Sequence, residues 1–462
     1  MILPQSFRMR LFPSLVYFFF ASFISAAEKP NIVYIVADDL GWKDVGFHGG
    51  NIATPNLDQL VAEGVELNQF YVQSICSPTR ASLMTGRYPM RLGLQVGVVR
   101  PWAKHGLPLQ ERTLANALRQ AGYFTAITGK WHLGHVTRDY LPTRRGFDHQ
   151  HGHYNGALDY FTHQREGALD WHRDDQPLPE EKGYTTNLIG AEAVRTIENH
   201  DPVKPLFLYV PFNAPHSPFQ APDPYIERYQ NLKPKNRKIL AAMITAMDDA
   251  IGRIIGALNK RKWRQNTLVL FHSDNGGVPR IADNGPLRGA KSTLYEGGVR
   301  VVALANWPGT LPAGSKVTEM MHAVDMYPTL ISLAGGTLDH PKQQPLDGVD
   351  VWPVITKGVK RSSDTILINS NPFHGAIRVG DFKLVKNGHV NNNQTEQAES
   401  ETFELFNLAE DPFEKNDLAQ SMPEKLAALK AVLTKFEKES VKANIPPNRM
   451  PSDFKVPEIW GH

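Results

Sequence analysis

The amino-acid sequence predicts an α/β protein whose large, mostly parallel sheet is flanked by helices. A smaller C-terminal α+β subdomain with an antiparallel sheet is predicted to follow it. Three observations support this: four short apolar runs end in polar or glycine-rich loops, helix-like segments alternate with these runs, and the pattern changes after residue 358. Strands that alternate with helices are typical of a sheet covered by helices on both faces.

The first residues have the order of a secretory signal peptide. Arg8 and Arg10 precede an apolar run over 11–24, and the small residues 25–27 offer a cleavage site before Glu28. The apolar run is too short and too soon interrupted for a membrane span, although an uncleaved anchor is the alternative reading. We therefore expect residues 1–27 to be a signal peptide. The protein is then secreted or periplasmic, with no stable membrane insertion.

Residues 28–358 are predicted to form the first and larger domain. Its apolar runs are rich in β-branched and aromatic residues, as expected of buried strands in a parallel sheet. These runs lie within residues 31–41, 123–134, 205–218 and 267–277. Helices are predicted over residues 57–63, 113–121, 186–199 and 239–260. Ligands bind outside the carboxyl ends of the strands in such sheets, and all four runs carry polar residues at that end.

Residues 359–462 are predicted to form the smaller subdomain. The segments TILINS and AIRVGDFKLVKNG resemble short antiparallel strands, and the polar insert over 391–401 has the composition of an exposed loop. Apolar residues at helical spacing predict a helix over 423–440 that begins at Pro423. The proline-rich tail from Asn444 is expected to run over the surface.

The composition excludes some functions and narrows the role of the single cysteine. The chain has 50 basic and 47 acidic residues, a formal net charge of +3, which gives no sign of a nucleic-acid surface. Cys76 is the only cysteine, so an intramolecular disulfide is excluded. A small buried hydrophobe is the ordinary role of a free cysteine.

Carboxylates follow two of the predicted strands. Asp38 and Asp39 end one strand, and Asp274 and Asn275 end another. Solvated turns are the simplest reading of such residues. If the two strands are neighbours, however, three carboxylates converge, and like charges about 4 Å apart repel by roughly 4 kcal/mol at a surface-like dielectric. A bound cation would relieve that repulsion, and the oxygen ligands favour Ca²⁺ or Mg²⁺ over zinc.

Cations and histidines occupy the other predicted strand ends. Each of these residues alone would most often be solvated, but together they make a recess suited to an anion; they are Arg80, Lys130, His132, His216 and Lys291. Pro78 suits the first turn of a helix running through Thr79–Thr85, so Cys76 is expected near the positive end of that helix. A thiol there could be activated as a thiolate nucleophile. These residues indicate a metal-assisted hydrolase of anionic substrates with Cys76 at its centre.

The segment CSPTRASLMTGR, residues 76–87, resembles the type I sulfatase signature Cys-x-Pro-x-Arg with its Leu-x-Thr-Gly-Arg extension. The segments DDLGWKDVGFHG, GKWHLG, LPTRRGFD, SDNGG and PLRGAKSTLYEGGVR stand in family order over most of the chain. The segments LPTRRGFD and EGGVR make the sequence most similar to the arylsulfatase B (N-acetylgalactosamine-4-sulfatase) branch. The resemblance implies an alkaline-phosphatase-like fold with residues 28–358 as the catalytic sulfatase domain. The chain lacks the disulfide cysteines of lysosomal members, which suggests a bacterial secreted relative.

The resemblance also implies a role for each site residue. Cys76 would be oxidised by a formylglycine-generating maturation enzyme, and the hydrated aldehyde would supply the nucleophilic oxygen. Arg80 and Lys130 would hold this hydrate and the sulfate, Lys291 would bind a sulfate oxygen, and His216 would lie near the leaving oxygen. His132 would accept the proton as the aldehyde reforms. One Ca²⁺ would be bound by Asp38, Asp39, Asp274, Asn275 and the modified residue 76.

A sulfated glycan is the expected substrate, with galacto configuration and sulfate at O4. A histidine-rich, aromatic segment after LPTRRGFD offers sugar contacts, since such side chains bind ring hydroxyls and pack on pyranose faces; they are His149, His151, His153, Asp159, Tyr160 and Trp171. An ordinary polar surface loop is the alternative reading of this segment. Two other functions stay open: a phosphonate or phosphate-ester hydrolase of the same superfamily, and a non-catalytic secreted glycan-binding protein.

Overall fold

The structure, a computed structural model, describes Met1, residues 29–388 and residues 401–461. The predicted signal peptide, residues 1–27, lies outside the described residues apart from Met1. The predicted polar loop over 391–401 lies outside them apart from Glu401.

A ten-stranded sheet forms the centre of the molecule. Its five middle strands are parallel to one another, in the order β11-β1-β10-β4-β5, and antiparallel strands flank them on both sides. The prediction of a mostly parallel sheet is therefore confirmed. In spatial order the strands are β14 (Ser315–Val317), β2 (Val65–Leu67), β13 (Ala303–Asn306), β11 (Thr267–Ser273), β1 (Asn31–Ala37), β10 (Leu206–Pro211), β4 (Phe124–Lys130), β5 (His149–His153), β8 (His172–Arg173) and β9 (Gln176–Pro177).

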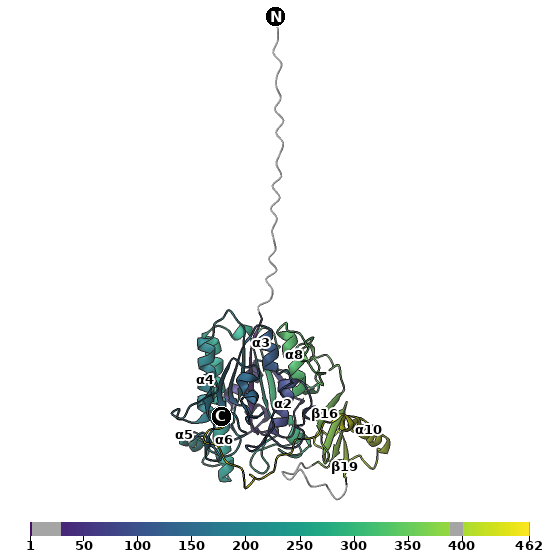
Figure 1. The fold of residues 1–462 in the computed structure, drawn as a ribbon. Helices are drawn as coiled ribbons and strands as arrows, with labels where there is room; N and C mark the ends of the chain where they lie inside the picture. The colour runs from purple at the N-terminus through teal and green to yellow at the C-terminus, as the bar shows by residue number, and fades with distance from the viewer. Residues whose placement is uncertain (2–28, 389–400, 462) are drawn as a thin grey trace.

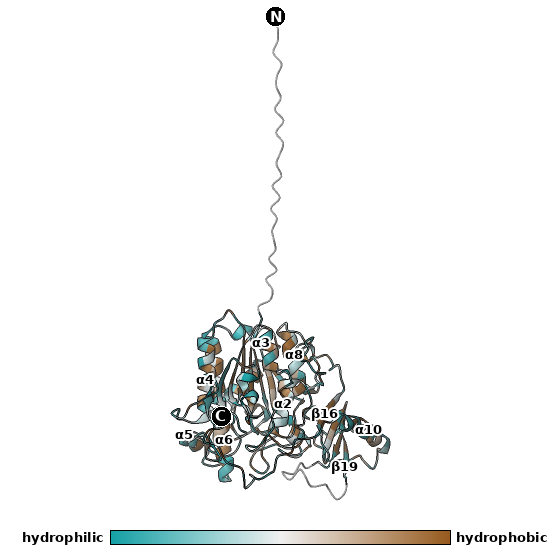
Figure 2. Ribbon diagram, in the orientation of Figure 1, coloured by the Kyte–Doolittle hydropathy of each residue, from teal (hydrophilic) through white to brown (hydrophobic). Residues whose placement is uncertain are grey.

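Helices cover both faces of this sheet because successive strand residues point to opposite sides. In β1, Ile32 and Tyr34 face a core shared with α2, α3 and α8, whereas Val33 and Ile35 face a core shared with α1, α4 and α6. Figure 1 shows α4 and α6 on one side of the strands and α2, α3 and α8 on the other. Figure 2 shows hydrophobic and hydrophilic residues along α4, as expected of a helix that buries one face.

The predicted helices are present with small shifts in their bounds. They are α1 (Pro55–Ala62), α2 (Cys76–Thr85), α3 (Leu114–Gln120), α4 (Thr185–Asn199), α6 (Lys235–Lys260) and α10 (Pro423–Glu439). Four shorter helices join them: α5 (Asp223–Ile226), α7 (Glu296–Val299), α8 (Met326–Leu333) and α9 (Trp352–Lys357). None of the helices among the described residues has both the length and the apolar character required to span a bilayer.

Helix α2 begins earlier than the sequence suggested. Its first residue is Cys76 and its third is Pro78, whereas the sequence predicts a helix over Thr79–Thr85 with Pro78 in its first turn. Proline is tolerated at the third position because the first four N–H groups of a helix have no intrahelical partner. Gly86 ends the helix with φ 68°, the left-handed conformation that glycine adopts at many helix ends.

The C-terminal part contains a four-stranded antiparallel sheet, as predicted. Its strands are β16 (Thr365–Ser370), β17 (Gly375–Val379), β18 (Phe382–Lys386) and β19 (Phe403–Asn407), of which the last was not anticipated. One face of this sheet packs against Leu429 and Leu433 of α10. The other face packs against the larger domain around Tyr71 and Val299. Smaller strand groups complete the fold: β12 (Arg300–Val301), β3 (Phe70–Tyr71) and β15 (Met321–His322), and the hairpin β6 (Gln164–Arg165) and β7 (Ala168–Leu169).

A buried ion cluster joins the C-terminal sheet to α7 and to the loop that precedes this helix. The Lys383 ammonium lies 2.9 Å from Glu296 Oε1 and 2.8 Å from Glu414 Oε1. The backbone N–H of Glu296 also donates to Glu414. Because Lys291 belongs to the same loop, the C-terminal sheet helps to position this predicted site residue.

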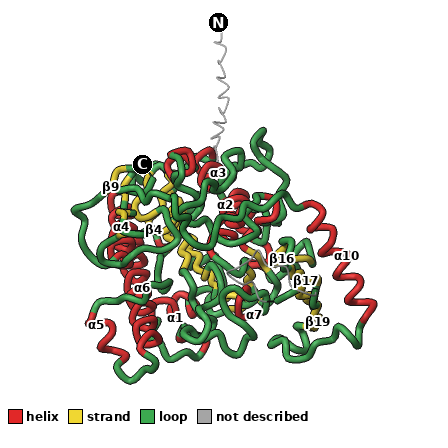
Figure 3. The backbone as a smooth tube through the Cα atoms, turned by 60° about the horizontal axis from the view of Figure 1, so that its bottom comes forward, coloured by secondary structure: helices red, strands yellow, loops and turns green. Residues whose placement is uncertain are grey.

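The tail after α10 returns to the larger domain. Val441 and Asn444 donate backbone hydrogen bonds to Met90 and Gly93. Near the end, Trp460 is buried. Figure 3 shows the C terminus beside β9, on the side of the molecule opposite α10. The tail therefore runs over the surface, as predicted, and crosses most of the molecule.

Candidate active site

The predicted carboxylates meet at the carboxyl edge of the central sheet. The last residues of β1 and β11 pair with each other in parallel, so Asp38 and Asp274 leave the sheet side by side. Lys130 is the last residue of neighbouring β4, and His216 lies in the loop after β10. Parallel strands carry all of these chain segments to one edge, where α/β proteins bind ligands.

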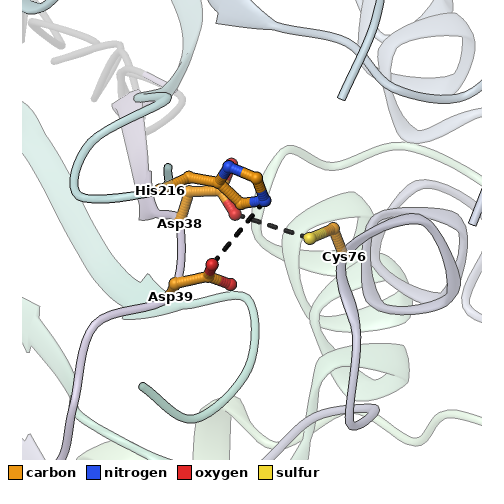
Figure 4. A group of neighbouring side chains, drawn as sticks. All are labelled: Asp38, Asp39, Cys76 and His216. Atoms are coloured by element: carbon orange, nitrogen blue, oxygen red, sulfur yellow. Dashed lines mark hydrogen bonds and ion pairs between the residues drawn. The ribbon is translucent and has the colours of Figure 1, made fainter. Parts of the chain in front are cut away.

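Cys76 lies at this edge as the first residue of α2 and is 2% exposed. Its thiol is 3.5 Å from Asp38 Oδ1 and 3.7 Å from the Lys291 ammonium. Figure 4 shows Cys76 pointing toward Asp38 and Asp39, which follow β1, and toward His216, which comes from another segment. The single cysteine is therefore in contact with the predicted metal and anion ligands.

The thiolate reading of Cys76 is wrong for this environment. Burial raises the pKa of the thiol well above its usual value, and the carboxylates of Asp274 and Asp38 raise it further against the opposing effect of Lys130 and Lys291. The start of α2 does not outweigh these effects. Cys76 consequently stays a protonated, unreactive thiol near neutral pH.

Three buried carboxylates are each paired with a cation that the sequence had placed in the anion recess. The shortest nitrogen–oxygen distances are 2.8 Å for Arg80–Asp274, 2.5 Å for Lys130–Asp38 and 2.6 Å for Lys291–Asp39. Buried ions require such partners because desolvation is costly. The pairing keeps the recess close to electrical balance.

The oxygen atoms of the site fit a hard divalent cation. Ligand atoms of Asp38, Asp39, Cys76 and His216 all lie within 4.8 Å of one another. Asn275 donates to Asp39 at 2.7 Å, while its own Oδ1 is buried and has no hydrogen-bond partner among the described residues. Burial and the adjacent Asp274 raise the pKa of Asp38 to about 7. A buried, unpartnered amide oxygen beside crowded carboxylates is the donor set that Ca²⁺ prefers.

His132 is held as a neutral ring with one free nitrogen. Its Nε2–H donates to the carbonyl of Val99 at 3.1 Å, and Nδ1 is buried without a hydrogen-bond partner in the described ranges. Burial and the nearby Lys130 hold the pKa of His132 well below its usual value. The residue adopts φ 58°, and a Cβ on Gly156 would lie 2.4 Å from its ring. The free Nδ1 therefore has a lone pair available to accept a proton.

His216 and Lys291 are the most accessible of the predicted catalytic residues, with 18% and 19% of their side chains exposed. The Nδ1–H of His216 donates to the carbonyl of Ser217 at 2.5 Å, which turns Nε2 toward Asp39 Oδ2 at 3.7 Å. Burial and then the charge of Lys291 lower the pKa of His216 to about 3. The ring is therefore neutral, with Nε2 able to gain a proton once Lys291 is neutralised by an anion.

A cavity of about 640 Å³ opens above these residues. Asp39, Cys76, His132, His216 and Lys291 line it. Arg80, Lys130, Asp38, Asp274 and Asn275 lie behind this wall, since they do not contribute to the lining. The volume falls within the roughly 300–1,000 Å³ of sites that enclose a small organic ligand, so the cavity has room for more than an inorganic anion.

The predicted sugar contacts require correction, because none of the six lines this cavity. Two are satisfied by carboxylates that the sequence analysis did not connect to them: His149 binds Asp174 and Glu192, and His151 binds Glu181 at 2.7 Å. Burial alone would lower the pKa of His149, as it does for His200 in the same region. The carboxylate partners of His149 nevertheless raise its pKa to about 9. These two histidines are therefore structural, because they bind carboxylates in the interior and at the edge of the sheet.

The other four are structural as well. His153 and Trp171 are fully buried, and the Trp171 indole donates to Glu181. The Tyr160 hydroxyl donates to the carbonyl oxygens of Asn213 and His216, at 2.6 and 2.8 Å, and so supports the His216 loop. Asp159 accepts backbone hydrogen bonds in its own turn. Two of these four lie next to predicted catalytic residues: Tyr160 contacts His216, and His153 is the strand partner of Lys130.

Several cavity residues were missed by the sequence analysis. Arg100 and Arg165 line the cavity, together with Ile445, Pro446 and Asn448 of the C-terminal tail. No local pattern marks the tail residues, which reach the cavity only through the fold. Gly156 also carried no sequence signal, because its role is to make room for the ring of His132.

The fold and the site define a hydrolase of anionic esters. Cations converge on a recess beside a hard-cation site, at the ligand-binding edge of an α/β sheet. A sequence model of the sulfatase family matches residues 30–336, more than half of the chain, so the chain belongs to the sulfatase family. It is an enzyme that hydrolyses sulfate esters.

Known proteins agree with this assignment along most of the chain. Arylsulfatase J of Mus musculus is 36% identical over an alignment that covers 95% of this chain and 81% of the relative. N-acetylgalactosamine-6-sulfatase of Sus scrofa is 34% identical over 72% of this chain and 67% of the relative. A crystal structure of Ps i-CgsB in complex with k-i-k-neocarrahexaose superposes with a TM-score of 0.81, at 34% identity over 90% of this chain and 94% of that one. The predicted family and alkaline-phosphatase-like fold are confirmed.

Proposed function

We propose that the enzyme releases sulfate from a sulfated carbohydrate by means of formylglycine made from Cys76 and one bound Ca²⁺. The observation that carries this proposal is the position of Cys76. A protonated, buried thiol that contacts both the carboxylates and Lys291 is a poor nucleophile as it stands. The hydrated aldehyde of formylglycine would supply the nucleophilic oxygen that this position lacks.

Asp38, Asp39, Asp274, Asn275 and the side chain at position 76 would hold the Ca²⁺. The bound ion would withdraw electron density from the sulfate and balance the carboxylate charge. Lys130 and Arg80, fixed behind the cavity wall by Asp38 and Asp274, would orient residue 76. Lys291, which lies on the wall, would bind a sulfate oxygen.

Two neutral histidines divide the proton transfers. His132 lines the cavity together with residue 76, and its free Nδ1 accepts the proton from residue 76 as sulfate is released. His216 serves the leaving oxygen. A bound sulfate offsets the charge of Lys291, raises the pKa of His216 and lets Nε2 carry the proton that the departing alkoxide requires.

The proposed substrate is a galacto-configured sugar with sulfate at O4, in a glycosaminoglycan or an algal galactan. The arylsulfatase B resemblance supports O4, and the relatives that act on N-acetylgalactosamine sulfate or bind a neocarrahexaose support a glycan. A formylglycine-generating enzyme would be the maturation partner, and the N-terminal sequence supports secretion. The phosphonate or phosphate-ester hydrolase remains the second candidate. The intact set of site residues argues against a non-catalytic glycan-binding protein.

A panel of defined saccharides tests the substrate. We expect sulfate release from galactose and N-acetylgalactosamine 4-sulfates with a higher kcat/KM than from the matched 2- and 6-sulfates, and slower turnover of the corresponding phosphate esters. Ion chromatography of released sulfate and phosphate gives the measurement. Preference for a 6-sulfate or for a glucosamine sulfate would contradict the O4 assignment. Preference for phosphate esters would favour the second candidate.

His216→Ala should affect a sugar sulfate far more than 4-nitrophenyl sulfate. A sugar alkoxide is a poor leaving group, and a positioned acid contributes about 10²–10⁴-fold, whereas nitrophenolate leaves without help. The ratio of kcat values for the two substrates is the measurement. His340→Ala, a histidine outside the cavity, is the matched control. Equal losses on both substrates would remove His216 from the acid role.

A further inference from the structure

Two arginines line the catalytic cavity without belonging to the catalytic ion pairs. Arg100 lies in the loop before α3, and Arg165 ends β6 of the β6–β7 hairpin. They share the cavity with Cys76, His216 and Lys291. The proposed sulfate cleavage gives neither of them a role.

Arg100 has no acidic partner among the residues that the structure describes. Its only hydrogen bond from the guanidinium within residues 29–388 and 401–461 is a long one, 3.5 Å to Asn448 Oδ1, and no carboxylate there forms an ion pair with it. Burial and the positive charge of Arg165 lower its pKa, and no acidic group counters them. The two arginines therefore repel each other across the same cavity.

Arg165 is only partly neutralised. It pairs with Glu166 at 3.1 Å, but the side chains are 28% and 34% exposed, and a surface pair of this kind contributes little. Its Nε is buried and lacks a hydrogen-bond partner among the described residues. A buried guanidinium N–H without a partner costs free energy that an incoming acceptor would recover.

The C-terminal tail holds both arginines in place. The indole of Trp102, two residues after Arg100, donates to the carbonyl of Pro447 at 2.6 Å. The indole of Trp460 donates to the carbonyl of Arg165 at 2.8 Å. Leu169 of β7 and Ile459 form a parallel bridge beside it. The tail thus fixes two like charges on one cavity, an arrangement that pre-organises them for an anion.

We propose that Arg100 and Arg165 bind a second anionic substituent of the substrate, next to the sulfate that is released. The inference rests on the proposed function and narrows its substrate to glycans with two neighbouring anionic groups. A sulfate ester and a uronate carboxylate share the required chemistry, because the guanidinium fork binds either group with two parallel hydrogen bonds. The cavity of about 640 Å³ has room for the intervening sugar atoms.

Three saccharides test the proposal: a galactose 4-sulfate disaccharide, its counterpart with a second sulfate on the neighbouring residue, and its counterpart with a neighbouring uronate. The wild-type enzyme should prefer one or both dianionic substrates over the monosulfated one, mainly through KM. In R100Q/R165Q this preference should fall about tenfold to a hundredfold, the effect expected from losing hydrogen bonds to a charged group. The dianionic substrate whose advantage is lost identifies the bound group.

Arg228→Gln, which replaces an exposed arginine outside the cavity, should keep the wild-type preference. An unchanged preference in R100Q/R165Q would overturn the proposal, as would equal losses on all three saccharides. Binding provides a test that does not need turnover. By calorimetry, the Cys76→Ala protein should bind a dianionic saccharide more tightly than the monosulfated one, and adding R100Q/R165Q should remove this difference. If this binding difference is present but the wild-type enzyme releases no sulfate, the catalytic proposal alone is refuted. If the Cys76→Ala protein binds the dianionic and monosulfated saccharides equally well, the subsite alone is refuted.

Discussion

Replacing Cys76 with alanine is expected to lower kcat for sulfate release by about 10⁴–10⁶-fold, the loss typical of removing a nucleophile, while the protein stays folded. The side chain is small and lies at the start of α2, so its removal leaves only a minor cavity. Its one short-range acceptor is Asp38, which keeps its ion pair with Lys130. Steady-state kinetics with circular dichroism and thermal unfolding provide the measurement.

Ser82→Ala is the matched control for this substitution. Ser82 lies on the same helix, is fully buried, and has an Oγ without a hydrogen-bond partner among the described residues. Its removal should therefore leave both activity and the unfolding temperature nearly unchanged. In active wild-type protein, the tryptic peptide that ends at Arg80 should carry an aldehyde, detected by its mass and by hydrazide labelling. Full activity in a preparation whose Cys76 is entirely thiol would contradict the formylglycine proposal.

The sequence was most informative where a chemical residue directly follows a buried strand. Asp38, Lys130 and Asp274 each end or follow an apolar run, and a parallel sheet carries such residues to one edge whatever the exact register. The convergence of the proposed metal and anion ligands at one edge of the sheet could therefore be inferred from local patterns alone.

The sugar contacts could not be inferred in this way. Histidines next to an aromatic residue resemble an exposed binding loop, but the burial of a histidine depends on partners that are distant in sequence. Glu181 and Glu192 come from the segment before α4 and from α4 itself, and they satisfy His151 and His149. Once these carboxylates are in place, the histidines are structural.

The cavity rim was inaccessible to sequence reasoning for a related reason. The contact between Trp460 and Arg165 joins residues 295 positions apart. A proline-rich tail has no periodicity from which its path can be predicted. Only the folded chain places Asn448 beside Arg100 and gives the tail a position at the catalytic cavity.

Asp39→Asn should remove the response of the enzyme to added Ca²⁺ and strongly reduce its rate of sulfate release. Although burial favours the neutral acid, Lys291 and His216 hold the pKa of Asp39 at about 2, so the wild-type carboxylate is charged at neutral pH and available to a cation. Asparagine matches its shape and tolerates its φ of 69°, so the substitution removes charge with little backbone strain. In the wild-type protein, Ca²⁺ at a hundredfold excess over its Kd should stabilise the fold by about 2.7 kcal/mol. Chelation should reverse this increase in thermal stability and stop sulfate release.

Asp44→Asn separates metal binding from the general cost of removing a buried acid on the same loop. Asp44 is fully buried like Asp39, but it pairs with Arg237 and does not line the cavity. Its substitution leaves Arg237 without its ion-pair partner and should therefore lower stability, by roughly 3–5 kcal/mol for a broken buried pair. The rise in unfolding temperature on adding Ca²⁺ should nevertheless persist in Asp44→Asn and be absent from Asp39→Asn. A carboxylate that binds the ion only in the folded state must contribute to the stabilising effect of the ion. An equal Ca²⁺ response in both variants would therefore contradict the assignment of Asp39 as a calcium ligand. Full activity of exhaustively chelated wild-type enzyme would contradict it as well.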